Sequence, residues 1–191
     1  GIELAKLDSK SVPDSPLGEY SGAGLIFGAS GGVMEAALRT ASKLITGKDN
    51  DDTLEFEPVR GLAGVKTASI TIGDKTLWIA AAQGLSEVEK VLNEVPKAKE
   101  EGREIPYHFI EVMACPGGCV GGGGQAWKIS DKIRVARIEG LYKTERTLPK
   151  RRSHDNPSVQ KLYAEFLGAP LSEKAEELLH TSYKPRPQYK R

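Results

Sequence analysis

The chain is organised around one segment, residues 107–125, which read YHFIEVMACPGGCVGGGGQ. Its first part, Tyr107–Met113, has the composition of a β-strand. The strand leads directly to Cys115 and Cys119, and six of the eight residues from 117 to 124 are glycine. Glycine permits backbone conformations closed to other residues and lets the main chain approach a bulky group closely. The segment therefore predicts a strand that ends in a ligand-binding loop.

Several uses fit the cysteine pair taken alone: two buried thiols, a disulfide, or half of a zinc site. The CxxxC spacing differs from the CxxC of thioredoxin-like redox proteins. A structural zinc site needs four ligands, and the histidines available, His108, His154 and His180, are each interpreted as structural. Backbone N–H groups can donate hydrogen bonds to inorganic sulfide and help set the potential of an iron–sulfur cluster. The glycine run therefore favours metal binding.

Secondary structure before this loop alternates between helix and strand. Apolar residues from Met34 to Ile45 recur with helical spacing, and Gly47 predicts the end of that helix. Two further strands and a helix are then predicted: Lys66–Ile72, Lys75–Ala82 after the hairpin turn Gly73-Asp74, and a helix with a capping box at Ser86 and Glu89 that ends or kinks near Pro96.

The last third of the chain is predicted to be helical. Helices are expected over Ser130–Leu148, after the cap at Asn156-Pro157, and over Ser172–His180. The predicted fold class is α/β: one lobe with a small mixed β-sheet flanked by helices, plus a helical C-terminal extension. We expect residues 1–126 to form the lobe with the cysteine loop and residues 127–191 the helical segment, within one structural unit.

A second glycine-rich stretch, Gly28-Ala-Ser-Gly-Gly32, follows the short apolar run Leu25–Phe27. Because helix N-termini bind phosphate, an anion cradle is one interpretation. The stretch fits neither GxGxxG nor the lysine-bearing P-loop pattern. We therefore favour a tight strand-to-helix turn whose glycines allow close packing.

Composition excludes several classes of protein. The chain has 191 residues and a formal net charge of +1, so no global field attracts it to nucleic acid or an anionic membrane. The longest apolar run, Leu77–Ala82, is far shorter than a membrane span. Two cysteines form no disulfide framework, and no signal peptide is evident. A cytoplasmic protein is expected, and because the first residue is Gly1 we expect a processed end or a piece of a longer polypeptide.

A local basic stretch lies near residues 143–152, at Lys143, Arg146, Lys150, Arg151 and Arg152. A solvated face is favoured over a surface for an acidic electron carrier or for the remainder of an enzyme.

The residues around both glycine stretches resemble a known family. Residues 111–125 are similar to the third signature of the iron-only ([FeFe]) hydrogenases, and Gly24–Thr40 is similar to the family's glycine-turn helix. Residues 152–181 resemble its small-subunit-like C-terminal segment. The resemblance spans most of residues 14–185.

The resemblance implies an active site called the H-cluster, in which a [4Fe–4S] cubane is joined through one cysteine thiolate to a di-iron unit with carbonyl, cyanide and dithiolate ligands. By position, Cys119 is the bridging thiolate and Cys115 a cubane ligand. Met113 matches a side chain against the di-iron unit, and Phe27 and Val33 match apolar pocket residues. Gln125, at the end of the glycine loop, is treated as structural.

The chain departs from the family pattern, and the departures show which residues an active enzyme would need from elsewhere. The first two family signatures, which supply the other cubane cysteines and a free proton-relay cysteine, are absent from the 191 residues. Ala126 replaces a usual proline, and Ser182 replaces the last histidine of His-Thr-His. The chain alone is therefore expected to be inactive and to need the N-terminal half of the catalytic domain.

The expected partners are that N-terminal half, an electron carrier such as ferredoxin or an NAD(P)-linked subunit, and H-cluster maturation proteins. Two alternatives to a hydrogenase stay open. Non-hydrogenase relatives with these loops act in iron–sulfur cluster assembly as scaffolds or adaptors, and a cluster-binding sensor or a metal-free structural module is a weaker alternative.

Overall fold

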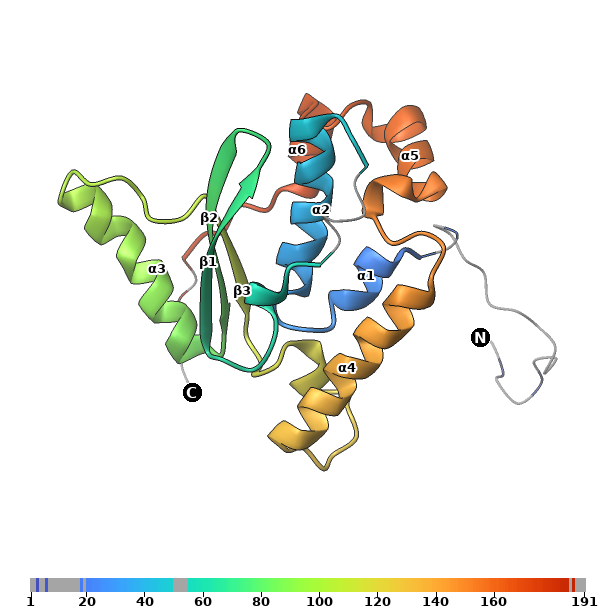
Figure 1. The fold of residues 1–191 in the computed structure, drawn as a ribbon, viewed down its shortest axis with the longest axis horizontal. Coiled ribbons are helices and arrows are strands. Elements are labelled where there is room, and N and C mark those ends of the chain that lie inside the picture. The colour runs from blue at the N-terminus through green and yellow to red at the C-terminus, as the bar shows by residue number, and fades with distance from the viewer. Residues whose placement is uncertain are drawn as a thin grey trace. The chain divides into compact units, whose positions relative to one another are not determined.

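The sheet at the centre of the fold has three strands in the order β1-β2-β3 (Figure 1). In this computed structural model, residues 20–49 and 55–185 are described, together with Glu3, Lys6, Gly18 and Pro187. They divide into two compact units, one covering Tyr20–Asn156 and the other containing the described residues before 20 and after 156.

Strands β1 (Val65–Ile72) and β2 (Lys75–Gln83) form the predicted hairpin, antiparallel and in register from Val65–Ala82 to Ile72–Lys75. Strand β3 (Phe109–Met113) pairs with β2 in parallel, so that Gln83 lies beside Met113. The connection between the two parallel strands is helix α3 (Leu85–Glu100). The predicted mixed sheet is thus confirmed.

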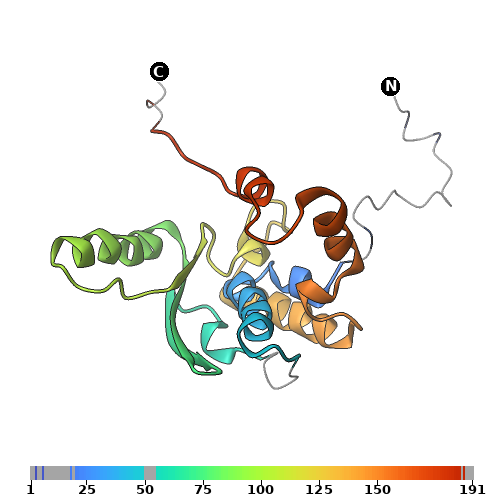
Figure 2. The same cartoon turned by 90° about the horizontal axis from the view of Figure 1, so that it is seen from above.

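Helices cover both faces of the sheet, which lies between α3 and α2 (Gly32–Thr46) in Figure 2. On one face, Val88 and Val91 of α3 pack against Ala80 and Ala82 of β2. On the other face the core consists of Met34, Leu38, Phe56, Val59, Ile72, Ile79 and Ala81, where residues 57–59 form the 3-10 helix η3 (Glu57–Val59). The α/β class is confirmed, and α2 ends at Gly47 as predicted.

Leu25–Phe27 was expected to be a strand, and this prediction is wrong. The run belongs mostly to helix α1 (Gly22–Ile26), which Ser21 caps by accepting a hydrogen bond from the Gly24 N–H at 3.3 Å. The first two N–H groups of the helix donate to the carbonyls of Lys150 and Arg151 at 2.7 and 3.0 Å. Three apolar residues carry no period, so these distant carbonyls and the burial of Ile26 decide the helix.

Helix α3 also departs from prediction at both ends. Its N-cap is Gly84, so Ser86 lies inside the first turn and forms no capping box. Pro96 lies within the helix, which continues to Glu100. The proline faces solvent, where a carbonyl that loses its helical partner can bind water, and the fully buried Ala98 packs the last turn against the protein.

Helix α4 (Asp131–Thr147) lies within the predicted range, and Ser130 caps it, since its hydroxyl accepts from the Ile133 N–H at 3.3 Å. It packs with α1 and with η4 (Cys119–Gly121), a 3-10 helix of the cysteine loop, around Ile26, Ala29, Val120, Ile138 and Tyr142. The unit ends with a 3-10 helix, η5 (Ser153–Asp155).

The second unit is helical, as predicted for the C-terminal segment. Helix α5 (Pro157–Leu162) continues into the π-helical turn η6 (Tyr163–Leu167), and α6 (Glu173–Leu179) follows. Ser172 caps α6 by accepting from the Ala175 N–H at 3.2 Å. None of the described helices is both long and apolar enough to cross a membrane.

Candidate functional site

The cysteine loop begins where the two parallel strands end. Met113 is the last residue of β3, and its carbonyl accepts from the Gly84 N–H at 2.9 Å. Cys115 is half-buried and Cys119 is exposed, and both thiols are free. A disulfide between them is therefore excluded in this structure.

Backbone hydrogen bonds fix the loop to the turn between α1 and α2. The Ser30 N–H donates to the Gly117 carbonyl, and the Val120 N–H donates to the Gly28 carbonyl, both at 3.0 Å. Gly118 has φ +88°, and a Cβ there would lie 2.7 Å from the Ser30 nitrogen. Only glycine meets both conditions, so this part of the glycine run is explained by packing within the chain.

The far end of the glycine run has no such explanation. A Cβ added at Gly123 or Gly124 would meet no atom within 4 Å among the described residues. Gly124 needs glycine for its φ of +88°, but the backbone at Gly123 does not. The main chain near Gly123 is therefore open to close approach by a group outside these residues. Gln125, predicted to be structural, is exposed beside it.

The glycine turn before α2 is not an anion cradle. The buried carboxylate of Glu111 accepts hydrogen bonds from the N–H groups of Gly31 and Met34, the latter at 2.7 Å. The helix N-terminus, which attracts negative charge, is thus already occupied by a side chain of β3. The favoured interpretation as a packing turn is confirmed, although it joins two helices rather than a strand and a helix. A Cβ at Gly31 would lie 1.8 Å from the Val59 carbonyl oxygen.

The other predicted site residues lie on elements that meet at this turn. Met113 is half-buried at the end of β3, and Val33 is half-buried in the first turn of α2. Phe27 follows α1 and leaves 43% of its surface exposed. Phe27 and Val33 flank the turn to which the cysteine loop is bonded, and Met113 lies two residues before Cys115.

Two buried polar residues behind the loop were not predicted. The Lys66 ammonium donates to the Ser30 carbonyl at 3.1 Å, to its hydroxyl at 3.0 Å and to the Gly61 carbonyl at 3.1 Å. Burial lowers the pKa of Lys66 to about 8, and the Glu111 charge opposes that shift. The only sequence signal was a lysine on the face of β1 that also carries the buried Ile72.

Gln83 is the second of these residues, and it is 4% exposed. Its Nε2 donates to the Ala63 carbonyl at 2.8 Å, and its Oε1 accepts from the Gly117 N–H between the two cysteines. A glutamine at the end of a strand carries no sequence signal for such a contact.

A buried ion-pair network joins α2 to α4. We use this name for Glu35, Arg39, Glu55, Arg60, Glu145 and Arg151. Arg39, whose side chain is fully buried, binds Glu35 at 2.8 Å and Glu145 at 2.7 Å. Arg60 binds Glu35 at 2.6 Å, and the Tyr142 hydroxyl donates to Glu35 at 3.0 Å.

Part of the basic stretch belongs to this network. Arg151 binds Glu145 and Glu55, each at 2.7 Å, and Arg146 lies 3.5 Å from Glu55. Burial would raise the pKa of Glu145, but hydrogen bonds from Arg151 and Arg39 hold it below its ordinary value. For Arg151 the interpretation as a solvated face is wrong, because its charge pairs with the fully buried Glu145, whereas Arg146 is exposed and agrees with that interpretation.

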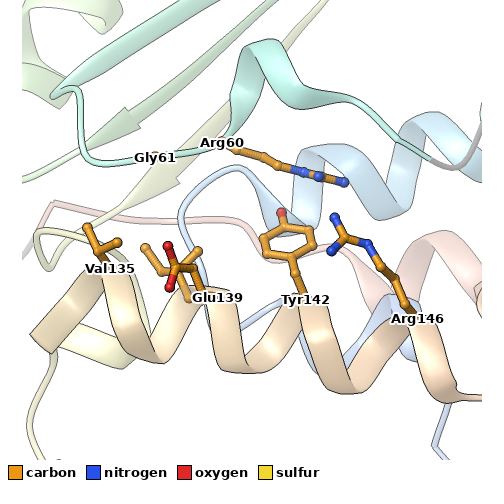
Figure 3. Close-up of a pocket in the computed structure, with 7 residues that line it drawn as sticks. Arg60, Gly61, Val135, Glu139, Tyr142 and Arg146 are labelled. Atoms are coloured by element: carbon orange, nitrogen blue, oxygen red, sulfur yellow. The ribbon is translucent and has the colours of Figure 1, made fainter.

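A cavity of about 300 Å³ adjoins the network along α4 (Figure 3). The Arg60 guanidinium lies over the Tyr142 ring, 4.1 Å from its centroid, and Arg146 reaches toward the same space. Both arginines already pair with glutamates, so their charges are compensated within the protein, and Glu139 also lines the cavity. The cavity belongs to the structural network rather than to the cysteine site.

Comparison with known proteins bears on the cysteine site directly. Residues 1–123 match the family model described as iron only hydrogenase large subunit, C-terminal domain, and residues 131–186 match iron hydrogenase small subunit. The chain is 46% identical over 192 residues to NADP-reducing hydrogenase subunit HndD of Solidesulfovibrio fructosivorans, covering 95% of this chain and 32% of that protein. It is 30% identical over 198 residues to Protein NAR1 of Arabidopsis thaliana, covering 96% of this chain and 40% of that protein.

A solved structure shows the same fold. A variant of the [FeFe]-hydrogenase HydA1 from Chlamydomonas reinhardtii matches with a TM-score of 0.63 and 40% identity. The match covers 96% of this chain and 51% of that chain. The chain thus spans about a third to two fifths of the curated relatives named above and half of this solved chain.

Fold and site together define an α/β lobe that presents two free thiols on a braced glycine-rich loop at the carboxyl ends of parallel strands. With a family model matching well over half of its length, this chain belongs to the iron-only hydrogenase family.

Proposed function

We propose that this chain is the C-terminal part of the catalytic domain of an [FeFe]-hydrogenase, which forms hydrogen reversibly from two protons and two electrons. The observation that carries the proposal is the pair of free thiols, one exposed and one half-buried, on a loop fixed to the lobe. Thiolates are the preferred ligands of iron–sulfur clusters. The family match supplies the class of reaction.

The residues present fit part of an H-cluster. Cys119 is proposed as the bridging thiolate and Cys115 as a cubane ligand, and a [4Fe–4S] cubane needs two ligands more. The open backbone at Gly123 fits the close approach of a large inorganic group. When bound, the H-cluster supplies the redox chemistry and the site at which hydrogen is made or split.

The remaining site residues are proposed to shape the environment of the cluster. Met113, Val33 and Phe27 are apolar and lie where the loop meets the α1–α2 turn, so they would exclude water from one side. The exposed surface of Phe27 would be covered by the N-terminal half of the domain, which would also supply the missing cysteines and the proton relay. The chain would be inactive without that half.

The proposed organisation and partners follow from the same assignment. Residues 1–126 would carry the cluster loop and residues 127–191 the small-subunit-like segment, in one structural unit. An electron carrier, either ferredoxin or an NAD(P)-linked subunit, and H-cluster maturation proteins would serve the assembled enzyme. A cytoplasmic location stays a prediction from the sequence.

An infrared spectrum of the anaerobically purified assembly that contains this chain tests the proposal. Bands from carbonyl and cyanide bound to iron are the expected result. A spectrum without these bands, from protein that is correctly assembled and treated with maturation proteins, would contradict the proposal.

A role in iron–sulfur cluster assembly is the second candidate. The similarity to Cytosolic Fe-S cluster assembly factor narfl of Xenopus tropicalis, 31% identical over 182 residues, favours it, and the higher identity to the hydrogenase subunit favours the first. Iron and sulfide bound without carbonyl or cyanide bands would support this second function.

A further inference from the structure

Gly117 lies midway between the two cysteines, and the protein holds both of its polar backbone groups. Its N–H donates to Gln83 Oε1, and its carbonyl accepts from the Ser30 N–H at 3.0 Å. The loop is also held at Val120, whose N–H donates to the Gly28 carbonyl at 3.0 Å, but Val120 lies beyond Cys119. The backbone between the two cysteines therefore depends strongly on what holds Gly117.

Gln83 can present only one face of its amide to Gly117. Its Nε2 donates to the Ala63 carbonyl at 2.8 Å, which directs Oε1 toward the loop. Its own backbone is fixed, because Gln83 pairs with Met113 in the sheet and its N–H donates to the Gly64 carbonyl at 2.8 Å. A buried amide with both halves bonded is a rigid anchor, whereas an unbonded one would be costly.

Lys66 secures the opposite side of Gly117 through Ser30. Its ammonium binds the carbonyl and the hydroxyl of Ser30, whose N–H in turn donates to the Gly117 carbonyl. Lys66 lies opposite Ala81 in the pairing of β1 with β2, and Gln83 lies two residues further along β2. Two neighbouring strands therefore hold Gly117: β2 holds its N–H through Gln83, and β1 holds its carbonyl through Lys66 and Ser30.

We propose that Gln83 and Lys66 are positioning residues that fix the backbone between Cys115 and Cys119, and so set the direction and spacing of the two thiols before any metal binds. The identity of the metal group rests on the proposed function, but the positioning of the thiols does not. Neither residue is proposed to touch the reacting atoms.

The full-length protein without its cluster is the material for the test. The substitution Gln83→Met keeps the length of the side chain and removes both hydrogen bonds. Ser42→Ala is the matched control, because the buried Ser42 hydroxyl has no hydrogen-bond partner within the described part of the chain. The two readouts are amide hydrogen exchange of the peptide containing Gly117 and the alkylation rates of Cys115 and Cys119 with iodoacetamide.

In wild type, the exposed Cys119 should react faster than the half-buried Cys115. Gln83→Met should raise exchange at Gly117 by about three- to tenfold, the factor that corresponds to one net hydrogen bond. It should also bring the two alkylation rates closer together, because a loosened loop exposes Cys115. Ser42→Ala should change neither readout, and Lys66→Met should act in the same direction as Gln83→Met.

Unchanged exchange and an unchanged rate ratio in Gln83→Met would overturn the proposal. If that variant fails to fold, Gln83→Asn, which keeps the amide but shortens its reach, is measured with the same two criteria. The infrared spectrum of the assembled wild-type enzyme separates the two proposals. A loosened loop in the variants without carbonyl and cyanide bands in wild type would overturn the proposed function and leave the positioning intact.

Discussion

The cysteine loop and the buried ion-pair network lie in the same unit and have opposite properties. In the loop, the two thiols form no disulfide within the described part of the chain, and one of them is exposed. In the network, Arg39, Glu35 and Glu145 are fully buried, and every carboxylate among them is paired with an arginine. The backbone of the loop is nevertheless hydrogen-bonded to the rest of the unit at Gly117 and Val120.

The ion-pair network stabilises the fold, whereas the cysteine loop is arranged to bind a ligand. Buried charges are tolerated only when they are paired, so the network is complete in itself. The free thiols on the cysteine loop, by contrast, gain a partner only when a ligand binds to them. Damage to the network should therefore reduce stability, and damage to the thiols should reduce function without affecting stability.

The largest expected effect is at Cys119, the proposed bridging thiolate. Cys119→Ser should abolish turnover of the assembled enzyme, because a hydroxyl does not replace a thiolate on iron. Because Cys119 is exposed, the free energy of unfolding should change by no more than about 0.5 kcal/mol. Hydrogen production by the assembled enzyme measures the first effect, and urea unfolding of the cluster-free wild type and variant measures the second. Retained turnover would refute the assignment of this residue.

Breaking the ion-pair network should have the opposite effect to Cys119→Ser, because it should lower the free energy of unfolding. Arg39→Met leaves Glu35 and Glu145 buried with fewer partners, so we expect a loss of about 3–5 kcal/mol in unfolding free energy. The control Arg103→Met removes an exposed pair with Glu101, 2.6 Å long, and should cost less than about 1 kcal/mol. Equal losses in the two variants, measured by urea unfolding, would show that the network is not what stabilises the unit.

A smaller effect is expected from Lys66 at alkaline pH. Its pKa is lowered to about 8 by burial, against 10.5 in the unfolded chain. Between these values the unfolded state binds more protons, so the contribution of Lys66 makes stability rise with pH across that window. Urea unfolding from pH 7.5 to 9.5 should show a rise that Lys66→Met removes. Lys75→Met, an exposed change on the same hairpin, controls for the lost charge.

The smallest effect is expected for Glu55, the exposed carboxylate of the network, on stability at low pH. Partial burial would raise the pKa of Glu55, but hydrogen bonds from Arg151 and Arg60 lower it to about 2, against 4.5 in the unfolded chain. Its stabilising contribution is present above pH 4.5 and lost as pH falls toward 2. Glu55→Gln should therefore flatten the acid side of a thermal-unfolding profile. An identical profile in the variant would place the acid sensitivity in other carboxylates.

Local sequence was sufficient for much of the fold. Helical spacing and the stop at Gly47 predicted α2, and the Gly73-Asp74 turn predicted the hairpin, because these signals act between residues close in the chain. Helices were also expected where α4 and α6 lie. Leu25–Phe27 and Pro96 were assigned wrongly for the converse reason. Distant carbonyls and a buried alanine decided those elements, and no local pattern reports them.

For the site, the sequence by itself determined which groups are available: two thiols four residues apart, the glycines around them and the apolar residues nearby. The order of residues along the chain fixes these groups and their spacing, whatever tertiary structure the chain adopts. Only the tertiary structure decided that the thiols are free, that Glu111 fills the N-terminus of α2, and that Gln83 and Lys66 hold Gly117 from two sides. Such side-chain contacts join residues from 34 to 80 positions apart, and a hydrogen bond across that separation exists only once hydrophobic packing has brought the strands and helices together.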